Sequence, residues 1–227
     1  NDQRKVIYEQ RREVMDAKPG DTIVGDMATD MRHDTIEGIV AAYMPPGSYS
    51  EQWDTDALEA ECAAILNLDL PIKDWAAEEG IADEEILERM MDASDKMMAK
   101  KAAEAGPEIM NRVEKAIILQ MLDQHWKDHL LALDHLRQGI NLRAFGQRDP
   151  LNEYKAEAFE MFESMLNALR ESVTRTLSFV EIDPELQAIN LIPRANLDNV
   201  QTNEAELEAA PTPVHQLAPN QTAQAKA

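Results

Sequence analysis

The amino-acid sequence predicts an all-α protein, and two observations carry this prediction. The 227 residues include 12 methionines but only 8 glycines, and alanine, leucine and glutamate, which favour helices, are frequent. No segment alternates apolar and polar residues as a half-buried strand does, and the best strand candidate, residues 22–24, is short and lies beside Gly20 and Gly25. We predict a long antiparallel helical hairpin and a further helix, with a small helical domain inserted between them and a disordered C-terminal tail.

The first 43 residues are expected to form two helices. Residues 1–16 are predicted to form a charged helix with few apolar contacts, namely Val6, Ile7, Val14 and Met15. A turn at 18–20 leads to a second helix over 27–43. The first helix has too little apolar surface to be stable alone, so we expect it to dock on another element. The prolines and glycine at 45–47 end the second helix and mark a boundary.

Residues 51–108 are predicted to form a small, strongly acidic helical module. They carry 17 acidic side chains against 5 basic ones. Two helices lie around Trp53 and Trp75, and a longer one runs from Asp83 until Gly106 and Pro107 close it. The charge is consistent either with a solvated face that keeps the protein soluble or with an acidic docking surface, and the solvated face is favoured.

Residues 109–182 are predicted to form a long hairpin. Between 109 and 142 the apolar positions repeat every seven residues, which is typical of a packing seam. The seam consists of Leu119, Leu122, Trp126, His129, Leu133, Leu136 and Ile140. A second helix, 151–180, has one apolar stripe, consisting of Phe159, Phe162, Leu166, Leu169, Val173 and Val180, with Leu151, Tyr154, Met161 and Met165 beside it. The short connection makes the two helices antiparallel neighbours.

The connection at the end of the hairpin differs from the rest of the chain. It consists of Arg143, Ala144, Phe145, Gly146, Gln147 and Arg148. An aromatic residue in a loop flanked by arginines suggests contact with a partner. Alternatively, Phe145 folds back on the helix ends as a cap, and spacing alone favours the cap.

Several classes of function are disfavoured by composition. Acidic residues outnumber basic ones by 43 to 22, which disfavours binding to nucleic acid, and no run approaches the ~18 apolar residues of a membrane span. The sequence contains neither of the two glycine-rich motifs that bind phosphate groups, Gly-x-x-x-x-Gly-Lys-Ser/Thr and Gly-x-Gly-x-x-Gly. No nucleotide site is therefore expected here. The start of the chain resembles neither a signal peptide nor an initiator-methionine start, which predicts part of a longer cytoplasmic protein. The single cysteine, Cys62, is predicted to be a small core residue.

One pair of residues could support metal chemistry. His125 and His129 are four residues apart and share a helix face, but Trp126 stands where the metalloprotease pattern has glutamate, and no third ligand is evident. Because His129 also belongs to the apolar seam, a packed and hydrogen-bonded histidine is favoured. A metal-dependent hydrolase and a free-standing helical adaptor remain as alternatives to the function considered next.

The hairpin segments resemble a known family. Leu119-Gln-Met-Leu-Asp-Gln-His-Trp-Lys-Asp-His-Leu130 and Leu136-Arg-Gln-Gly-Ile-Asn-Leu-Arg-Ala-Phe-Gly-Gln-Arg-Asp-Pro-Leu-Asn-Glu-Tyr-Lys155 resemble the two-helix finger of the SecA family, the bacterial preprotein translocase ATPases. Residues 1–12, 43–46 and 68–72 agree with other parts of that family. The resemblance implies a helical scaffold domain at 1–43 and 109–182, interrupted by a helical wing domain at 44–108 and followed by a flexible linker at 183–227.

The resemblance also implies a role for each part. In this family, motor domains that bind ATP and magnesium lie outside such a segment, so neither a catalytic residue nor a cofactor or metal is expected within this chain. The finger reaches into the SecYEG channel, its tip contacts the unfolded preprotein, and its packing residues help to restrain the motor ATPase. The expected location is the cytoplasm and the cytoplasmic face of the bacterial inner membrane.

This sequence departs from the family pattern at three places. Phe145 stands where tyrosine is most common at the tip, and Ala144 stands where glycine is common. The zinc-binding motif with which many members end, and which binds the chaperone SecB, does not follow Gln187 in this sequence, so either it lies beyond these residues or this member lacks it. SecB is therefore not assigned as a partner. The resemblance favours partner contact at Phe145 over the cap.

Overall fold

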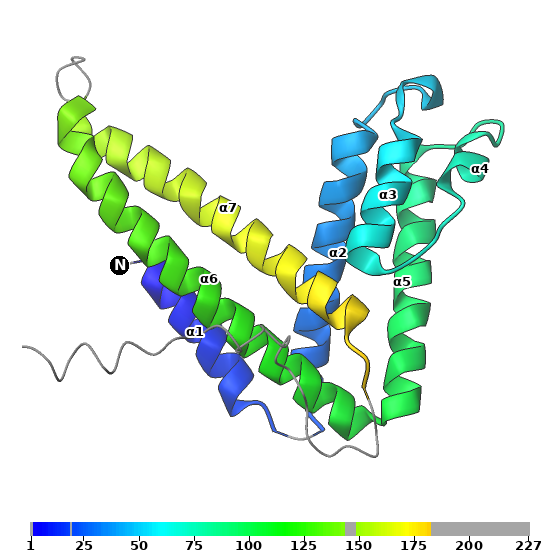
Figure 1. Ribbon diagram of the computed structural model, residues 1–227, viewed down its shortest axis with the longest axis horizontal. Helices are drawn as coiled ribbons and strands as arrows, with labels where there is room; N and C mark the ends of the chain where they lie inside the picture. The colour runs from blue at the N-terminus through cyan, green and yellow to red at the C-terminus, as the bar shows by residue number, and fades with distance from the viewer. Residues whose placement is uncertain (1, 19, 144–148, 183–227) are drawn as a thin grey trace, which may run out of the picture. The chain divides into compact units, whose positions relative to one another are not determined.

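The computed structural model describes residues 2–18, 20–143 and 149–182, with the side chains of 141–143 excepted. In these residues the chain forms seven α-helices and one short 3-10 helix, and no strand, which confirms the all-α prediction (Figure 1). The elements are α1 (Asp2–Asp16), α2 (Ile23–Tyr43), the 3-10 helix Ser50–Gln52, α3 (Thr55–Leu66), α4 (Ile72–Ala76), α5 (Asp83–Ala105), α6 (Pro107–Arg143) and α7 (Pro150–Phe179).

The helix ends follow from local sequence. The Asp54 carboxylate accepts a hydrogen bond from the Ala57 amide at the start of α3, and the Asp149 carboxylate accepts one from Leu151 before α7. Pro150 stands in the first turn of α7, where its missing N–H removes no helical bond. Gly106 has φ +86°, which a residue with a Cβ rarely adopts, and so separates α5 from α6.

The weak strand candidate at 22–24 instead begins a helix. Thr22 precedes α2, and Val24 within its first turn is fully buried. The start of α2 therefore lies four residues before the predicted start at 27, because burial of Val24 adds a turn that periodicity alone did not reveal.

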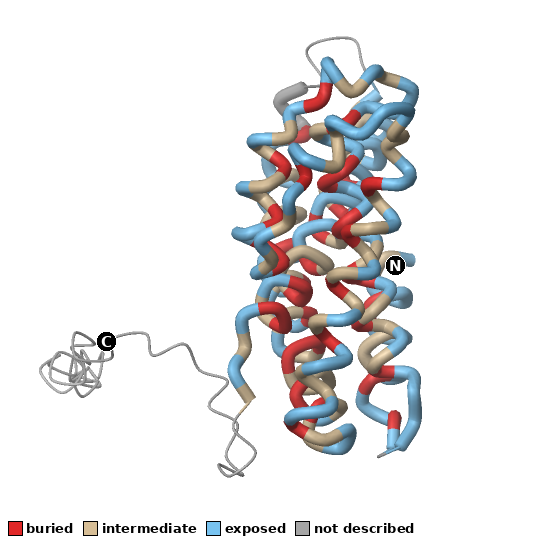
Figure 2. Tube along the Cα trace, turned by 90° about the vertical axis from the view of Figure 1, so that its right-hand side faces the viewer, coloured by how far each residue is buried: buried red, intermediate tan, exposed pale blue. Residues whose placement is uncertain are grey.

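The helices of the acidic module share one apolar core with the second half of α2. Figure 2 shows the buried positions in red along the helices. The buried members of this core are Ile36, Ile39, Val40, Met44, Trp53, Leu58, Cys62, Ile65, Leu66, Ile72, Ile86 and Met90. The core thus extends across the predicted boundary at 44. Cys62 is fully buried in it, as predicted.

The long helices α6 and α7 run antiparallel side by side, as predicted, and α1 packs along α6 (Figure 1). Ile7 and Val14 are the buried residues of α1, whereas Val6 and Met15, which were expected to make contacts, are about half exposed. A largely charged helix such as α1 has one narrow apolar side, and the residues directly beside its buried positions face the solvent.

The apolar stripe of α7 differs from the prediction. Its buried positions follow the sequence Ala158, Phe162, Met165, Leu169, Val173 and Leu177. Phe159 is 62% exposed and Leu151 is 58% exposed. The inward position is taken by the small Ala158, and each further residue is rotated by about 100° around the helix, so Phe159 faces away from the contact.

Two predictions fall on residues that the structure does not describe. The flexible linker at 183–227 and the tip residues 144–148 both lie outside the described residues. None of the described helices combines the length and the low charge that crossing a bilayer requires.

Candidate functional site: the helical hairpin and its supports

The predicted seam of α6 lies where the helix meets its neighbours. Leu122 is fully buried, and Trp126, His129 and Ile140 are less than a tenth exposed. The other three seam residues are half-buried, and they are Leu119, Leu133 and Leu136. Since all seven predicted positions avoid full exposure, the seven-residue pattern located the packing side of α6.

His129 lies between two aromatic rings. Its imidazole centroid is 5.6 Å from the Trp126 ring and 5.6 Å from the Phe162 ring, which belongs to α7. Its Nε2 lies 3.1 Å from Oε1 of Gln3 in α1. Burial lowers the pKa of His129, which favours the neutral imidazole at neutral pH. This is the packed, hydrogen-bonded histidine that the sequence favours.

His125 does not join His129 at a common ligand position. Its Nε2 lies 2.9 Å from the Ser172 hydroxyl of α7, so the two imidazoles engage different partners on different helices. In the described part of the chain, no three His, Cys, Asp or Glu side chains are arranged to hold a metal ion. The geometry therefore gives the hydrolase alternative no support.

α1 is fastened to α6 by charged side chains along its length. Arg11 forms a two-point ion pair with Asp123, with Nε–Oδ1 at 2.8 Å and Nη2–Oδ2 at 3.2 Å. At the C-terminal end of α1, the Lys115 ammonium donates to the carbonyls of Met15 and Ala17 at 2.8 and 2.9 Å. Lys115 thus supplies cationic donors to the carbonyls that α1 leaves free at its C-terminus.

A buried ionic group joins α2 to α5. The Arg32 side chain is 6% exposed and pairs with Asp95 of α5, which also lies 2.9 Å from His33 Nε2. Burial alone would raise the pKa of Asp95, but hydrogen bonds from His33 and Arg32 hold it below its usual value. Burial raises the pKa of Glu114 of α6, against the opposing effect of Arg32. Arg32 is therefore the charged centre of the contact among α2, α5 and α6.

The C-terminal end of α7 is held by Lys101 of α5. Its ammonium donates to the carbonyls of Leu177, Ser178 and Val180. Burial lowers the pKa of Lys101, and Glu181 opposes this shift. A cation at the carbonyl end of a helix also interacts favourably with the helix dipole. This contact links the acidic module to the base of the hairpin.

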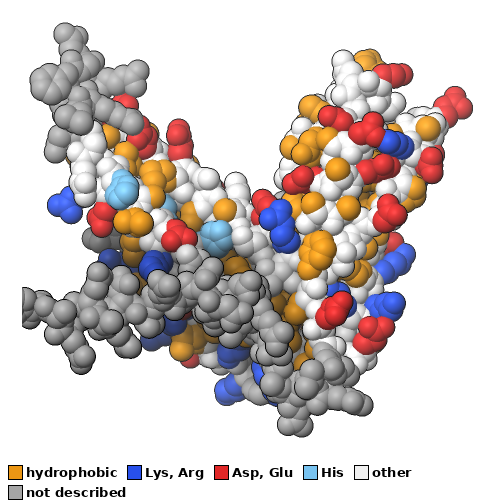
Figure 3. Space-filling view, viewed as in Figure 1, with side chains coloured by type: hydrophobic (Ala, Val, Ile, Leu, Met, Phe, Trp, Pro, Cys, Tyr) orange, Lys and Arg blue, Asp and Glu red, His pale blue; other side chains and the backbone are white. Residues whose placement is uncertain are grey.

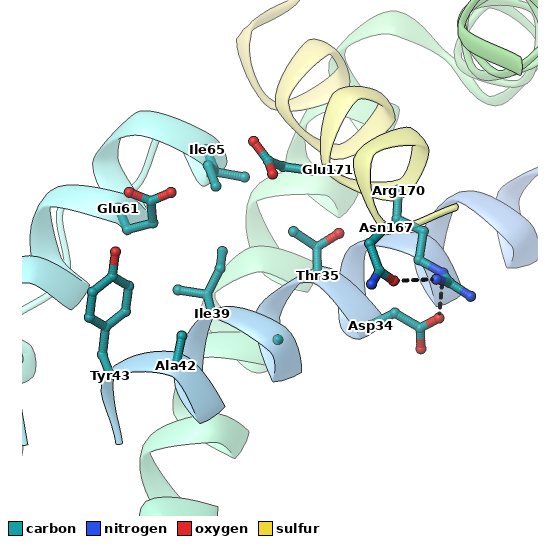
Figure 4. A pocket seen from close by; sticks show the side chains of 11 residues that line it. Asp34, Thr35, Ile39, Ala42, Tyr43, Glu61, Ile65, Asn167, Arg170 and Glu171 are labelled. Carbon is teal, nitrogen blue, oxygen red and sulfur yellow. Dashed lines mark hydrogen bonds and ion pairs between the residues drawn. The ribbon is translucent and has the colours of Figure 1, made fainter. Parts of the chain in front are cut away.

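A cleft of about 310 Å³ lies where α2, α3 and α7 meet (Figure 4). Arg170 is turned towards Asp34, with Nε–Oδ2 at 3.0 Å, and its Nη1 donates to the side-chain oxygen Oδ1 of Asn167 at 2.8 Å. Tyr43 and Glu61 lie across the cleft. Because the Arg170 guanidinium is already paired within the chain, the cleft does not present it as a free anion-binding group.

The structure locates the tip of the hairpin only through the residues on either side of it. Arg143 is the last residue of α6, and Asp149 precedes α7, so the segment between them joins the far ends of the two longest helices. The side chain of Arg143 and all of Ala144, Phe145, Gly146, Gln147 and Arg148 lie outside the described part of the structure. The choice between partner contact and cap stays a prediction.

Acidic side chains are spread over the surface of α3, α4 and α5 (Figure 3). Seven of them are exposed or half-exposed near α4 and the start of α5, namely Asp74, Glu78, Glu79, Asp83, Glu84, Glu85 and Glu88. They include Glu78, which makes a two-point pair with Arg89 at 2.6 and 2.7 Å. Their spread over several helices is consistent with the solvated face that the sequence favoured.

Several supporting residues were not found by sequence analysis, among them Gln3, Arg32 and Lys101. Gln3, Arg32 and Lys101 each join helices that are far apart in sequence. The one signal available was Arg32 itself, a charged residue between the apolar positions Met31 and Ile36 of a predicted helix. Gln3 and Lys101 carry no such signal, because both lie in polar stretches.

The fold and the site together define an all-helical support module, in which a long antiparallel hairpin is braced by one helix and joined at its base to a small helical core. The chain belongs to the SecA family, because it matches the SecA Wing and Scaffold domain over residues 1–181. This confirms the resemblance seen in the hairpin segments.

Curated relatives of the chain include three proteins named protein translocase subunit SecA. That of Afipia carboxidovorans is 55% identical over 184 residues, covering 81% of this chain and 19% of the relative. That of Bradyrhizobium diazoefficiens is 50% identical over 210 residues, covering 92% and 22%, and that of Caulobacter sp. strain K31 is 53% identical over 182 residues, covering 80% and 19%. The chain thus spans about a fifth of the length of these relatives.

Proposed function

We propose that this chain is the wing and scaffold portion of a SecA protein translocase, in which the hairpin couples ATP hydrolysis in motor domains to movement of preproteins through the SecYEG channel. The observation that carries the proposal is the pair of antiparallel helices α6 and α7, of 37 and 30 residues, in a chain of the SecA family. ATP and magnesium belong to the motor domains, and this chain contributes no catalytic residue.

The proposed role of the hairpin is that of a stiff arm. A helix rises about 1.5 Å per residue, so the 30 residues of α7 extend about 45 Å. The buried seam keeps α6 and α7 together, and α1 supports α6 from outside. A displacement at the base is then delivered to the tip instead of being absorbed by bending, which is what coupling over such a distance requires.

The proposed contact at the tip is apolar. Phe145 supplies an aromatic ring without a hydroxyl group, so it can grip an unfolded chain by its surface but cannot donate a hydrogen bond. Arg143 and Arg148 add positive charge on either side. In this proposal the protein works in the cytoplasm and at the cytoplasmic face of the inner membrane, where it meets SecYEG and the preprotein.

The test places residues 1–182 in the matching segment of the Afipia carboxidovorans relative and measures preprotein transport into membrane vesicles. Phe145→Gly is expected to abolish transport while ATP binding is unchanged, whereas Phe145→Tyr retains it. Phe159→Ala is the matched control, because Phe159 is an exposed aromatic residue of the same hairpin, 62% exposed, away from the tip. Normal transport by the Phe145→Gly protein contradicts the proposed role of the tip.

A second measurement tests the proposed restraint on the motor. The motor portion of the same relative is expressed separately, and its ATP hydrolysis is measured with and without this chain. Binding with a lowered rate supports the restraint. If the chain neither binds the motor portion nor changes its rate, the restraint is not carried by these residues and the free-standing adaptor is favoured.

A further inference from the structure

The side chain of Gln3 touches both helices of the hairpin. Its amide Nε2 donates to the carbonyl oxygen of Ala158 in α7 at 2.9 Å, and its Oε1 lies 3.1 Å from Nε2 of His129 in α6. Gln3 itself is in the first turn of α1 and is half-buried. One planar amide therefore connects α1 to both helices of the hairpin, through partners that lie more than a hundred residues from Gln3 in sequence.

The chemistry of the three partners fixes each proton. A peptide carbonyl oxygen only accepts hydrogen bonds, so the Gln3 atom facing Ala158 must be the amide nitrogen. The other Gln3 atom is then the carbonyl oxygen, which can only accept, and so the donor on His129 must be Nε2–H. The orientation of one side chain thus selects one tautomer of the buried imidazole.

The residues around this contact leave little freedom for alternatives. His129 is 4% exposed and lies between the rings of Trp126 and Phe162, and Ala158 is 8% exposed. The small side chain of Ala158 leaves its carbonyl open to a second donor beside the helical one. A buried donor or acceptor that loses its partner costs free energy. Moving the Gln3 side chain away would leave the His129 Nε2–H without its acceptor and would break the bond to the Ala158 carbonyl, so both contacts hold the amide in place.

We propose that Gln3 is a positioning residue that fastens α1 to both arms of the hairpin at once and holds His129 in the Nε2–H form. Arg11 and Lys115 fasten α1 to α6 alone, whereas Gln3 adds α7. Any shift of α1 along the hairpin, or any separation of the arms at this level, must break a hydrogen bond of this amide. α1 and the middle of the hairpin therefore move as one body.

This inference deepens the proposed function, because it names the contact through which α1 would control the hairpin. Its test uses this chain alone and measures no transport. The Gln3 contact and the proposed function can therefore fail independently. If substitution of Gln3 has no effect, the proposed role of the tip still stands, and if the tip variants transport normally, the Gln3 contact still stands.

The experiment compares Gln3→Met with Gln10→Met by nuclear magnetic resonance. Methionine has nearly the shape of glutamine but neither hydrogen-bonding group. Gln10 is in the same helix, and among the described residues its amide contacts only the Met27 sulfur, at 4.0 Å, which makes it the matched control. The ring nitrogens of His129 report the tautomer, and the exchange rate of the Ile7 amide, which pairs with the carbonyl of residue 3 in a helix, reports the stability of α1.

The unmodified chain is expected to show His129 as the Nε2–H tautomer and a protected Ile7 amide. Gln3→Met is expected to release the imidazole to a mixture of tautomers and to raise the Ile7 exchange rate on the order of tenfold, as loss of about one hydrogen bond predicts. Gln10→Met should change neither. If Gln3→Met leaves both the tautomer and the exchange rate unchanged, the proposal is wrong.

A second variant separates the two ends of the amide. In Gln3→Glu the carboxylate still accepts from His129 but cannot donate to Ala158, where two oxygens then face each other. The expected results are a rise of about one unit in the pKa of His129 and faster exchange at Ile7. The neighbouring Asp128, Glu160 and His125 are the same in both proteins, so they do not account for a difference. An unchanged His129 pKa would overturn the assigned contact.

Discussion

The strongest stability prediction concerns the ion pair between Arg32 and Asp95. The guanidinium side chain of Arg32 is 6% exposed, and its Nε has no hydrogen-bond partner among the described residues, so Asp95 carries most of its compensation. Asp95→Asn keeps the size of the side chain and an acceptor oxygen but removes the charge. The variant thus removes the counter-ion that contacts the nearly buried cation, while Glu114 still interacts with it electrostatically.

The expected loss follows from the exposure of the two partners. Removing one member of a fully buried pair costs about 3–5 kcal/mol. Asp95 is 46% exposed, and water screens that side of the pair, so we expect a loss of about 2 kcal/mol in the free energy of unfolding. For a domain of this size that corresponds to a fall of about 4–8 °C in the midpoint of thermal unfolding.

The assay is urea denaturation followed by circular dichroism at pH 7. Asp92→Asn is the matched control, because Asp92 lies on the same helix, its side chain is 61% exposed, and it pairs with the exposed Lys96 one turn away. The control should lose less than about 0.5 kcal/mol. An Asp95→Asn protein as stable as this control would refute the assigned role of Asp95.

The same group predicts how stability depends on pH. The folded pKa of Asp95 is lowered, so its contribution is complete above the unfolded value of 3.8 and is lost as the pH falls through the folded value. Glu114 acts in the opposite sense. Its folded pKa is raised above 4.5, so its burial destabilises the fold at neutral pH and this cost is relieved as the pH falls towards 4.5. Glu114→Gln should therefore raise stability at pH 7 and abolish the gain on mild acidification.

Three further predictions follow from single side chains. Leu122→Ala, at a fully buried seam position, should cost about 2–5 kcal/mol of unfolding free energy in urea titrations without a change in slope, and a smaller loss would mean that the seam is loosely packed. Burial raises the pKa of the Cys62 thiol to about 12, so Ellman's reagent at pH 8 should label it only after denaturant is added, and prompt labelling of the native chain would contradict its burial. Lys101→Met should cost about 1–2 kcal/mol and speed amide exchange at the end of α7, whereas Lys100→Met, at a residue whose side chain is 76% exposed, should do neither.

The helices and their ends could be predicted because their causes are local. Prolines and glycines at 45–47, 106–107 and 150 end or begin helices through their own backbone geometry, and the heptad spacing of α6 gave the side that packs. The stripe of α7 was predicted one residue away from the true line at Phe159. Apolar character alone cannot show that the small Ala158, and not the larger neighbour, takes the inward place.

The supports of the hairpin could not be predicted because their partners are distant in sequence. Nothing near Gln3 indicates that its amide meets Ala158 and His129, and nothing near Lys101 indicates the end of α7. The shared core across residue 44 has the same origin, since α2 continues to pack against α3 and α5 up to the prolines. The family resemblance supplied the proposed role of the tip, which helix periodicity and spacing left undecided between contact and cap.

The central claim is that the tip of the hairpin contacts the chain being transported. The most direct measurement places a photo-crosslinking amino acid at position 145 of the chimeric translocase and illuminates it while a preprotein is arrested in the channel. We predict a crosslink between position 145 and the preprotein that requires ATP, and none from the same group at position 159. Arrested transport without any crosslink from position 145 would contradict the claim.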